Sequence, residues 1–455
     1  MDGQVQDNNL GMIRGWRGII KFTLPMIVTM LFISTYTVVD GLFVSNFIDT
    51  DALAAVNILM PVATLLSAVG FMFSTGGSAY VSNLLGKGET MKASSSFTLI
   101  ILVSIVIALI LTAIGLLFMD PIARILGADD TLIDGAVEYG TVYVLFAPFL
   151  ILQFLFTQFL VVAGKPKMSL AVSVAGGVAN MVLDYLLIVV LDMGMTGAAL
   201  ASGMGSLVPA VFSMSILFRK TNYIFFTKPV WNPEAISRSC TNGVSEMVTE
   251  LSGGIIILFY NLVMMSYIGP DGVAAITIVS YVQFLALSII IGYSNGIAPV
   301  MSFDHGADDR KGMQDVLRIS LTFVMSISLA VFIIIELFAP EIAALFASSS
   351  EEVMAIVVNG SRVFAIGFLF LGFNIYASSL FTSLSNGLIS AAVSAVRSLV
   401  LLAPLIVILP YLLGIDWVWA ASPLTEFITA LIALFFILRL NPRYGYLRER
   451  SASVR

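Results

Sequence analysis

Twelve long apolar stretches limit the folds that this chain can adopt. A helix that crosses the hydrocarbon core of a bilayer needs about 20 mainly apolar residues. That rule predicts twelve spans, at 19–46, 52–83, 94–118, 137–163, 168–190, 195–218, 238–267, 272–302, 316–338, 357–383, 388–411 and 417–438. Charged residues make up 11% of the chain, against about 25% in soluble domains. The chain is therefore predicted to be an all-α polytopic membrane protein.

The composition argues against most catalytic and cofactor-binding functions. Cys240 is the single cysteine and His305 the single histidine, so neither an internal disulfide nor a histidine- or cysteine-based metal site is expected. The sequence contains no hydrolase or metalloprotease motif, and nothing in it indicates nucleic-acid binding. We therefore expect neither an enzyme nor a bound cofactor.

The basic residues predict the orientation of the spans. With both termini cytoplasmic, 19 of the 22 basic residues fall in cytoplasmic segments. The other three are Arg124, in an outer loop, and Arg362 and Arg397, within spans. Because basic loops stay on the cytoplasmic side, we predict a multi-pass protein of the cytoplasmic membrane with both termini inside.

The two halves of the chain match each other at a constant offset of 220 residues. "DALAAV" from Asp51 matches "DGVAAI" from Asp271, and "MDPIARIL" from Met119 matches "APEIAALF" from Ala339. Six spans per repeat is an even number, so both halves have the same orientation in the membrane. Their pseudo-twofold axis is then expected to run along the membrane normal, as in two-lobed transporters with a central cavity.

A polar connection separates the two halves. The segment "RKTNYIFFTKPVWNPE" holds two prolines and three basic residues between the sixth and seventh spans. We therefore predict an N-terminal lobe at 1–218, a cytoplasmic linker at 219–235 and a C-terminal lobe at 236–455.

Two polar side chains interrupt the fifth span. In "ANMVLDYLL", which begins at residue 179, Asn180 and Asp184 lie four residues apart and share one face of a helix. A carboxylate near the bilayer centre costs about 2.5 to 3.5 kcal/mol on insertion scales, so an intramembrane acid is a candidate functional residue. Asp40 in the first span and Ser202 in the sixth lie at a similar depth. These four residues form the candidate coupling site.

This coupling site allows two chemistries. Two carboxylates close together in a low dielectric cannot both stay ionised cheaply, so the pair can exchange a proton. Two carboxylates, an amide oxygen and a hydroxyl also form an all-oxygen set of the kind that hard cations prefer, which permits a Na⁺ site. The structural alternative is that neighbouring helices satisfy each acid by hydrogen bonding. No other metal is expected.

Polar residues in other spans give weaker signals. Glu250 in the seventh span, Glu426 in the last and Tyr36 in the first are candidates to line a cavity or contact substrate. Arg397 either pairs with an intramembrane acid or extends toward the membrane surface. Pro25 is expected to bend the first helix, since proline removes a backbone hydrogen bond.

The second repeat lacks the residues of the coupling site. At the offset of 220, Asn180 corresponds to Val400 and Asp184 to Pro404. The second half therefore shares the scaffold but not the acids, and ion handling is predicted to belong to the first lobe.

Three segments resemble those of the multidrug and toxic compound extrusion (MATE) transporters. They are "LPMIVTMLFISTYTVVDGLFVS" in the first span, "GGVANMVLDYLLI" in the fifth and "MGMTGAALAS" in the sixth. Members of one branch carry an acid in the tenth span, but "SRVFAIGFLFLGFNIYASSLF" contains none. In this respect the chain resembles the DinF-like branch.

The resemblance implies two lobes that export bulky, often cationic or amphipathic drugs in exchange for inward Na⁺ or H⁺, by alternating access. It places the family's cation or proton site on Asp40, Asn180, Asp184 and Ser202, and a bend of the first helix on Pro25. The expected partners are small organic compounds and membrane lipid, and the protein is expected to be a monomer. The alternative is a lipid-linked oligosaccharide flippase of the same superfamily, whose polyanionic substrate would need a cationic cavity.

Overall fold

The computed structural model describes residues 10–47, 50–219, 223–347 and 351–447, apart from the side chains of 37–51, 53 and 345–347. These residues form helices and no strand. The first half forms α1 (Gly15–Phe47), α2 (Thr50–Ile58), α3 (Met60–Gly86), α4 (Thr90–Ile125), α5 (Ile133–Leu145), α6 (Ala147–Val162), α7 (Pro166–Asp184), the π-helical η1 (Tyr185–Val190) and α8 (Gly194–Leu217).

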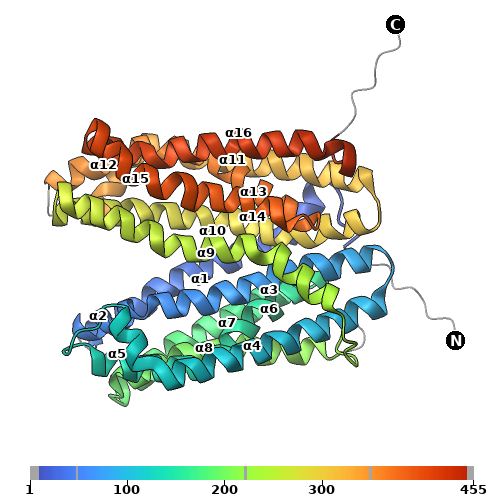
Figure 1. The fold of residues 1–455 in the computed structure, drawn as a ribbon, viewed down its shortest axis with the longest axis horizontal. Coiled ribbons are helices and arrows are strands. Elements are labelled where there is room, and N and C mark those ends of the chain that lie inside the picture. Colours follow the sequence, from blue (N-terminus) through green and yellow to red (C-terminus); the bar gives the residue numbers. More distant parts are fainter. Residues whose placement is uncertain (1–9, 48–49, 220–222, 348–350, 448–455) are drawn as a thin grey trace, which may run out of the picture.

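The second half repeats this order of helices. It forms α9 (Pro233–Tyr267), α10 (Pro270–Gly306), α11 (Arg310–Ala347), α12 (Glu351–Ala365), α13 (Phe368–Ser383), α14 (Gly387–Ala395), the π-helical η2 (Val396–Leu402), α15 (Ala403–Leu413), the 3₁₀-helical η3 (Ile415–Ala420) and α16 (Ala421–Tyr444). The two sets of helices lie in two bundles, one above the other in Figure 1, which we call the N-lobe and the C-lobe. The boundaries predicted at 218 and 236 stay a prediction.

The predicted twelve spans are present when each bent pair of helices counts as one. Within the described residues, ten helices are long and apolar enough to cross a membrane alone. The two pairs α5 with α6 and α12 with α13 meet at 49° and 51°. Both pairs occupy the fourth span of their repeat, so the bend is a property of the repeat.

Two predicted span limits differ from the structure for identifiable reasons. The span predicted at 52–83 is divided into α2 and α3, because Pro61 lies in the first turn of α3 and cannot continue a preceding helix. The helix predicted at 94–118 extends over Thr90–Ile125, because the hydropathy rule does not count the polar turns at helix ends.

The lobes touch where helices cross without intervening side chains. A Cβ on Gly76 of α3 would overlap the backbone of α9 at Ser239 and Gly243, and a Cβ on Gly296 of α10 would touch Thr23 of α1. At the offset of 220, Gly76 corresponds to Gly296 and Thr23 to Gly243. The α3–α9 and α1–α10 crossings are therefore copies of one contact.

The axis of this symmetry passes through the crossing of α3 and α10. A Cβ on Gly86 would overlap the backbone at Phe303, and a Cβ on Gly306 would overlap the backbone at Asn83. Each of these contacts becomes the other at the offset of 220, as a twofold relation requires. Both helices end here, beside the termini, so the axis runs along the bundle as the even number of spans predicts.

All these crossings lie in the halves of the helices nearest the end of the molecule that carries both termini. We call this end the terminal end and the other the distal end. The ribbons of the two lobes are closest at the terminal end and diverge toward the distal end (Figure 1).

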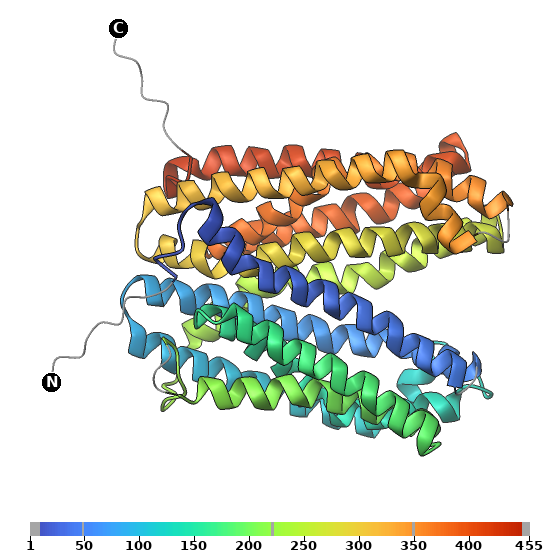
Figure 2. The same ribbon diagram turned by 180° about the vertical axis from the view of Figure 1, so that it is seen from behind.

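Helix α1 belongs to both lobes along its length. Near its start, Leu10 and Ile19 are fully buried in a core shared with Tyr293 and Met301 of the C-lobe. Further along, α1 packs against α7 of the N-lobe. Figure 2 shows α1 in dark blue passing from one bundle to the other. Any relative movement of the lobes at the terminal end therefore has to move or deform the start of α1.

Candidate functional site

The candidate coupling site is built on a close contact between α7 and α8. A Cβ on Gly205 of α8 would lie 2.7 Å from Cβ of Asn180, and a Cβ on Gly176 of α7 would lie 2.8 Å from the carbonyl oxygen of Gly205. These small residues let the two backbones approach, which is how membrane helices commonly associate. The contact presses Asn180 into the interface between the helices.

Helix α1 closes the same place from a second side. A Cβ on Gly177 would lie 3.0 Å from the Tyr36 ring, and it would also overlap the ring of Phe32. Since α1 and α7 both start at the terminal end, Asp40, about 6 Å further along α1 than Tyr36, lies at the level of Asn180 to Asp184. The side chain of Asp40 lies outside the described residues.

The third helix brings Ser202 to this level. Helix α8 starts at the distal end, and its Gly205 faces Asn180, so Ser202, about one turn nearer the distal end, lies at the depth of Asp184. Ser202 is half-buried. The common depth predicted from the sequence therefore holds for the backbone positions of all four residues, and their role in coupling stays a prediction.

Asn180 and Asp184 are withdrawn from solvent. Their exposed fractions are 3% and 0%. The amide oxygen of Asn180 has no hydrogen-bond partner among the described residues. Because a buried polar atom is normally hydrogen-bonded, an unpaired amide oxygen beside a buried carboxylate is the arrangement expected where a cation or a protonated group is bound.

The backbone changes character directly after Asp184. Asp184 ends α7, and Tyr185 begins the π-helical segment η1. One-turn π segments within α-helices occur often at functional sites, because the extra residue re-aims the side chains around it. Apolar periodicity does not predict this segment, since it does not distinguish an α-helix from a π-helix.

A metal centre built from several acids is not present in the described part of the chain. No group of three or more His, Cys, Asp or Glu side chains lies close enough to hold a metal ion there. This statement does not include Asp40, whose side chain lies outside the described residues. A Na⁺ ion at the coupling site would depend on Asn180, Ser202 and backbone oxygens as well as acids.

The C-lobe holds a second buried polar cluster. The amide nitrogen of Asn374 in α13 donates to the carboxylate of Glu426 at 2.6 Å and to its backbone oxygen at 2.8 Å. Nε of Arg397 in η2 lies 3.8 Å from the other carboxylate oxygen of Glu426. Of the two possibilities raised by the sequence, Arg397 therefore pairs with an intramembrane acid.

Two further acids lie beside this cluster. Glu246 and Glu250, one turn apart in α9, are half-buried. Arg397 interacts electrostatically with Glu246, and Glu246 with Glu250. The direct contacts described above join Glu426, Arg397 and Asn374 in one network, which we call the C-lobe cluster. Asn374 was missed in the sequence, because an uncharged amide in an apolar span carries little signal without its partner 52 residues away.

Helix α1 is continuous through Pro25 in this structure. Pro25 lies inside the helix, and the hydroxyl of Thr29 donates to its backbone oxygen at 2.8 Å. A bend at Pro25 in another state of the protein stays a prediction.

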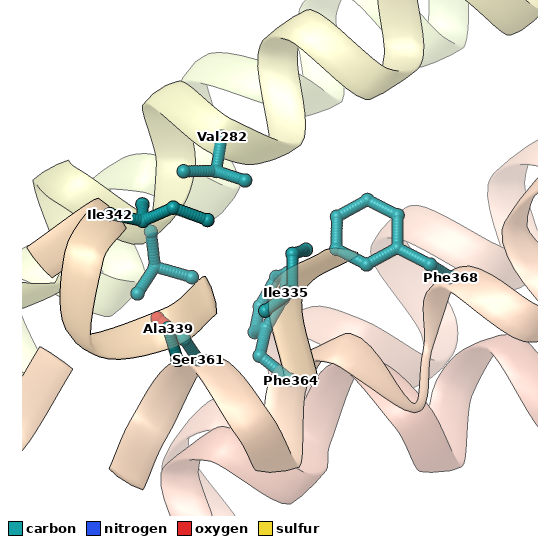
Figure 3. A pocket seen from close by; sticks show the side chains of 8 residues that line it. Val282, Ile335, Ala339, Ile342, Ser361, Phe364 and Phe368 are labelled. Carbon is teal, nitrogen blue, oxygen red and sulfur yellow. The ribbon is translucent and has the colours of Figure 1, made fainter. Parts of the chain in front are cut away.

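A small hollow in the C-lobe is lined by none of these residues (Figure 3). Its lining is mainly apolar and comes from α10, α11, α12 and α13: Val279, Val282, Ile335, Ala339, Ile342, Ser361, Phe364 and Phe368. Four of these side chains, Val279, Ile335, Phe364 and Phe368, also belong to the buried core of the C-lobe. The hollow offers one hydroxyl and no charge, so it is a packing defect and not an ion site.

The two-lobed arrangement corresponds to a known family. The family model described as MatE matches residues 25–186 and again residues 247–408, one segment in each lobe. The chain belongs to the MATE family of transporters. The first segment contains Asp40, Asn180 and Asp184, and the second contains Glu250 and Arg397.

Several MATE relatives match over nearly the whole chain. The multidrug export protein MepA of Staphylococcus haemolyticus (strain JCSC1435) is 26% identical over 442 residues, which cover 94% of each protein. MepA of Staphylococcus aureus (strain NCTC 8325 / PS 47) is 27% identical over 442 residues, again covering 94% of each.

Solved MATE structures share the fold at lower identity. The outward-facing conformation of a multidrug resistance MATE transporter of the MOP superfamily is 23% identical, with a TM-score of 0.88 over 98% of this chain and 100% of the other. A MATE crystal structure in a straight conformation is 22% identical, with a TM-score of 0.90 over 97% and 100%. These matches show the fold alone, and the predicted two-lobed, all-α architecture is confirmed by them.

Proposed function

We propose that this MATE protein is an antiporter that exports small organic compounds, cationic or amphipathic, across the cytoplasmic membrane. Inward movement of H⁺ or Na⁺ through the coupling site, Asp40, Asn180, Asp184 and Ser202, drives export. The relatives named as multidrug export proteins support this substrate class. Both termini are proposed to be cytoplasmic, so the terminal end is the inner end.

The single observation that carries the coupling role is the burial of Asp184 and Asn180 where α1, α7 and α8 meet. Burying an acid in an apolar lobe costs free energy, and the packing of the lobe does not require an acid there. Binding of a proton or cation offsets that cost, and it therefore favours whichever lobe conformation binds it better.

The contacts between the lobes support alternating access. The glycine crossings close the molecule at the terminal end, which is the arrangement of an outward-facing state. The guanidinium of Arg14, ahead of α1, adds a polar contact there, at 2.7 Å from Asp304 and 2.9 Å from Asp309. These two acids belong to the C-lobe side, so an inward-facing state has to break this ion pair, which we call the Arg14 latch, or bend α1 between Arg14 and the part that packs on the N-lobe.

The flippase alternative finds less support. A polyanionic lipid substrate needs free cationic groups in the transport path, but Arg397 already faces Glu426 and Glu246. The matched relatives named above are multidrug exporters. Glu250 and Tyr36 stay candidates for contact with a cationic substrate, whereas the carboxylate of Glu426 is engaged within its own lobe.

The test is efflux of ethidium from vesicles reconstituted with the purified protein, under separately imposed Na⁺ and proton gradients. Wild-type protein is expected to respond to one of the two gradients, which names the ion. Asp40→Asn and Asp184→Asn are each expected to lose gradient-driven efflux by at least ten-fold while the protein stays folded, because a neutral amide cannot cycle between charge states.

Asp192→Asn is the matched control. Asp192 is an exposed acid in the turn after η1, and its backbone φ of 50° suits asparagine as well as aspartate. Wild-type rates are expected for this variant. Wild-type rates in both Asp40→Asn and Asp184→Asn would rule out the coupling site.

A further inference from the structure

The same three helices carry a polar cluster in each lobe. In the N-lobe, α1, α7 and α8 meet at the coupling site. By the repeat, their counterparts are α9, the α14–η2 helix and α16, which carry Glu246, Arg397 and Glu426. These helices are also in contact. The C-lobe cluster therefore lies on the equivalent helices. Arg397 and Glu426 are about one turn nearer the terminal end than Val400 and Ser422, which match Asn180 and Ser202.

The two places differ in their own positive charge. At the offset of 220, Arg397 corresponds to Gly177 and Glu426 to Ser206. Gly177 leaves no room for a side chain, because the rings of Phe32 and Tyr36 lie against it. In the C-lobe the equivalent position supplies a guanidinium on a long side chain.

The geometry of Arg397 is that of a shared counter-ion. The 3.8 Å separation from Glu426 is longer than a hydrogen bond, and Asn374 supplies the hydrogen bond to that carboxylate instead. The guanidinium also acts on Glu246, on the opposite helix. Its side chain is 15% exposed and that of Glu426 6% exposed, so this charge balance is made away from solvent.

Oxygen atoms are available around Glu426 beyond those that the ion pair uses. The amide oxygen of Asn374 and the hydroxyls of Thr425 and Thr429 are buried without a hydrogen-bond partner among the described residues. Asn374 lies directly against Glu426, so its unpaired oxygen is a further buried acceptor next to that carboxylate. The positive charge at this place is Arg397.

We propose that Arg397 is a tethered cation, which takes the place of an external ion in the C-lobe. It balances the charge of Glu426 permanently, so this carboxylate does not have to take up an external ion, and H⁺ or Na⁺ is bound in the N-lobe during each cycle. Arg397 thereby determines how many ions are exchanged for one substrate molecule. This inference rests on the proposed antiport function and adds the ion count to it.

The test measures coupling stoichiometry in reconstituted vesicles. Ethidium flux is followed while the membrane potential and the gradient of the coupling ion are varied separately, and the combinations at which net flux stops give the number of ions exchanged per ethidium. Arg397→Met leaves Glu426 without a counter-ion. This variant is expected to exchange one more cation per ethidium than the wild type and to show a steeper dependence on ion concentration.

Two further variants separate charge from packing. Arg397→Lys keeps the charge and is expected to keep the wild-type stoichiometry. The double variant Arg397→Met with Glu426→Gln removes one charge of each sign, and it is also expected to keep the wild-type stoichiometry. The double variant tests the proposal even where Arg397→Met alone does not fold. Its residue 426 is uncharged, so the loss of Arg397 does not leave a buried carboxylate without its partner there.

Three results would overturn the proposal. They are active Arg397→Met with the wild-type ion count, Arg397→Lys with an additional ion, and the double variant with an additional ion. Asp184→Asn is measured in parallel. If that variant retains gradient-driven efflux, the proposed N-lobe function fails, whereas the ion count of Arg397→Met bears on the tethered cation alone.

Discussion

At the residue scale, Asn180 offers the clearest ligand atom of the coupling site. Its amide oxygen is buried and has no partner among the described residues, and α8 holds its Cβ in place through Gly205. An oxygen held in this way loses little conformational freedom when it binds a cation. In the proposed mechanism the amide contributes to ion affinity and not to the charge change itself.

Asn180→Ala is expected to raise the ion concentration for half-maximal ethidium efflux by about ten-fold or more, since a polar contact to a charged group contributes about 1.5 to 3 kcal/mol. The maximal rate is expected to stay close to that of the wild type. Ser206→Ala is the control, because the hydroxyl of Ser206 donates to Gly203 within its own helix. An unchanged half-saturating concentration in Asn180→Ala would remove Asn180 from the site.

The single residues show what could be predicted from the sequence. Asp184 and Asn180 were found because they contrast with an apolar run, and contrast is a local property. The sequence does not identify the partner of Arg397, because a base and an acid that pair between two spans can be any number of residues apart in the chain. Asn374 was missed for the same reason. Its importance comes from the hydrogen bond to Glu426, which exists only in the folded lobe.

At the element scale, α1 is the helix that connects the two lobes at the terminal end. Arg14 binds Asp304, whose side chain is fully buried, and Asp309, which is 40% exposed. A Cβ on Gly312 would lie within 3 Å of Asp304, Asp309 and Arg14 together, so a side chain at this position would displace the Arg14 latch. The predicted spans 19–46 and 272–302 stop short of Arg14 and Asp304, and the sequence does not predict their contact, because they lie 290 residues apart.

Arg14→Ala is expected to loosen the closed terminal end. The native Cys240 reports on this, because it is the single cysteine of the chain and packs from α9 against the core of the N-lobe. Its rate of alkylation by a maleimide is expected to rise several-fold in Arg14→Ala. Arg17→Ala, which removes an exposed arginine in the first turn of α1, serves as the control and is expected to match the wild type. Equal rates in all three proteins would contradict the Arg14 latch.

The same measurement has an expected pH dependence. The backbone N–H of Gly312 and the Arg14 guanidinium hold the pKa of Asp309 below its usual value. A lowered pKa in the folded state means that the stabilisation is present above the unfolded-state pKa and is lost as the pH falls through the folded-state pKa. The ratio of the Arg14→Ala rate to the wild-type rate is therefore expected to decrease toward acidic pH. This ratio cancels the pH dependence of the thiol itself, and a ratio that rises on acidification would contradict the assignment.

The helices also show where hydropathy stops being informative. It predicted the number and order of spans, since these depend on the length of apolar runs. It could not predict the bends between α5 and α6 and between α12 and α13, nor the π-helical segments η1 and η2. Those features depend on how neighbouring helices satisfy backbone groups, which a linear pattern does not contain.

At the scale of the whole molecule, the repeat explains the symmetry of the scaffold and the asymmetry of its chemistry. The reciprocal contacts Gly86–Phe303 and Gly306–Asn83 tie the lobes on the pseudo-twofold axis. The polar residues do not follow this symmetry, because Asn180 and Asp184 correspond to Val400 and Pro404 at the offset of 220. A symmetric frame therefore carries the acids proposed to bind the ion in one lobe and the Arg397–Glu426 ion pair in the other.

The central claim is that the N-lobe acids exchange their ion for substrate. The most direct measurement is ion release from the purified, detergent-solubilised protein when ethidium is added, followed with a pH indicator for H⁺ and with ²²Na⁺ for sodium. Wild type and Asp192→Asn are expected to release one of the two ions on ethidium binding, and Asp184→Asn is expected to bind ethidium without releasing either. Equal ion release from Asp184→Asn and the wild type would contradict the claim.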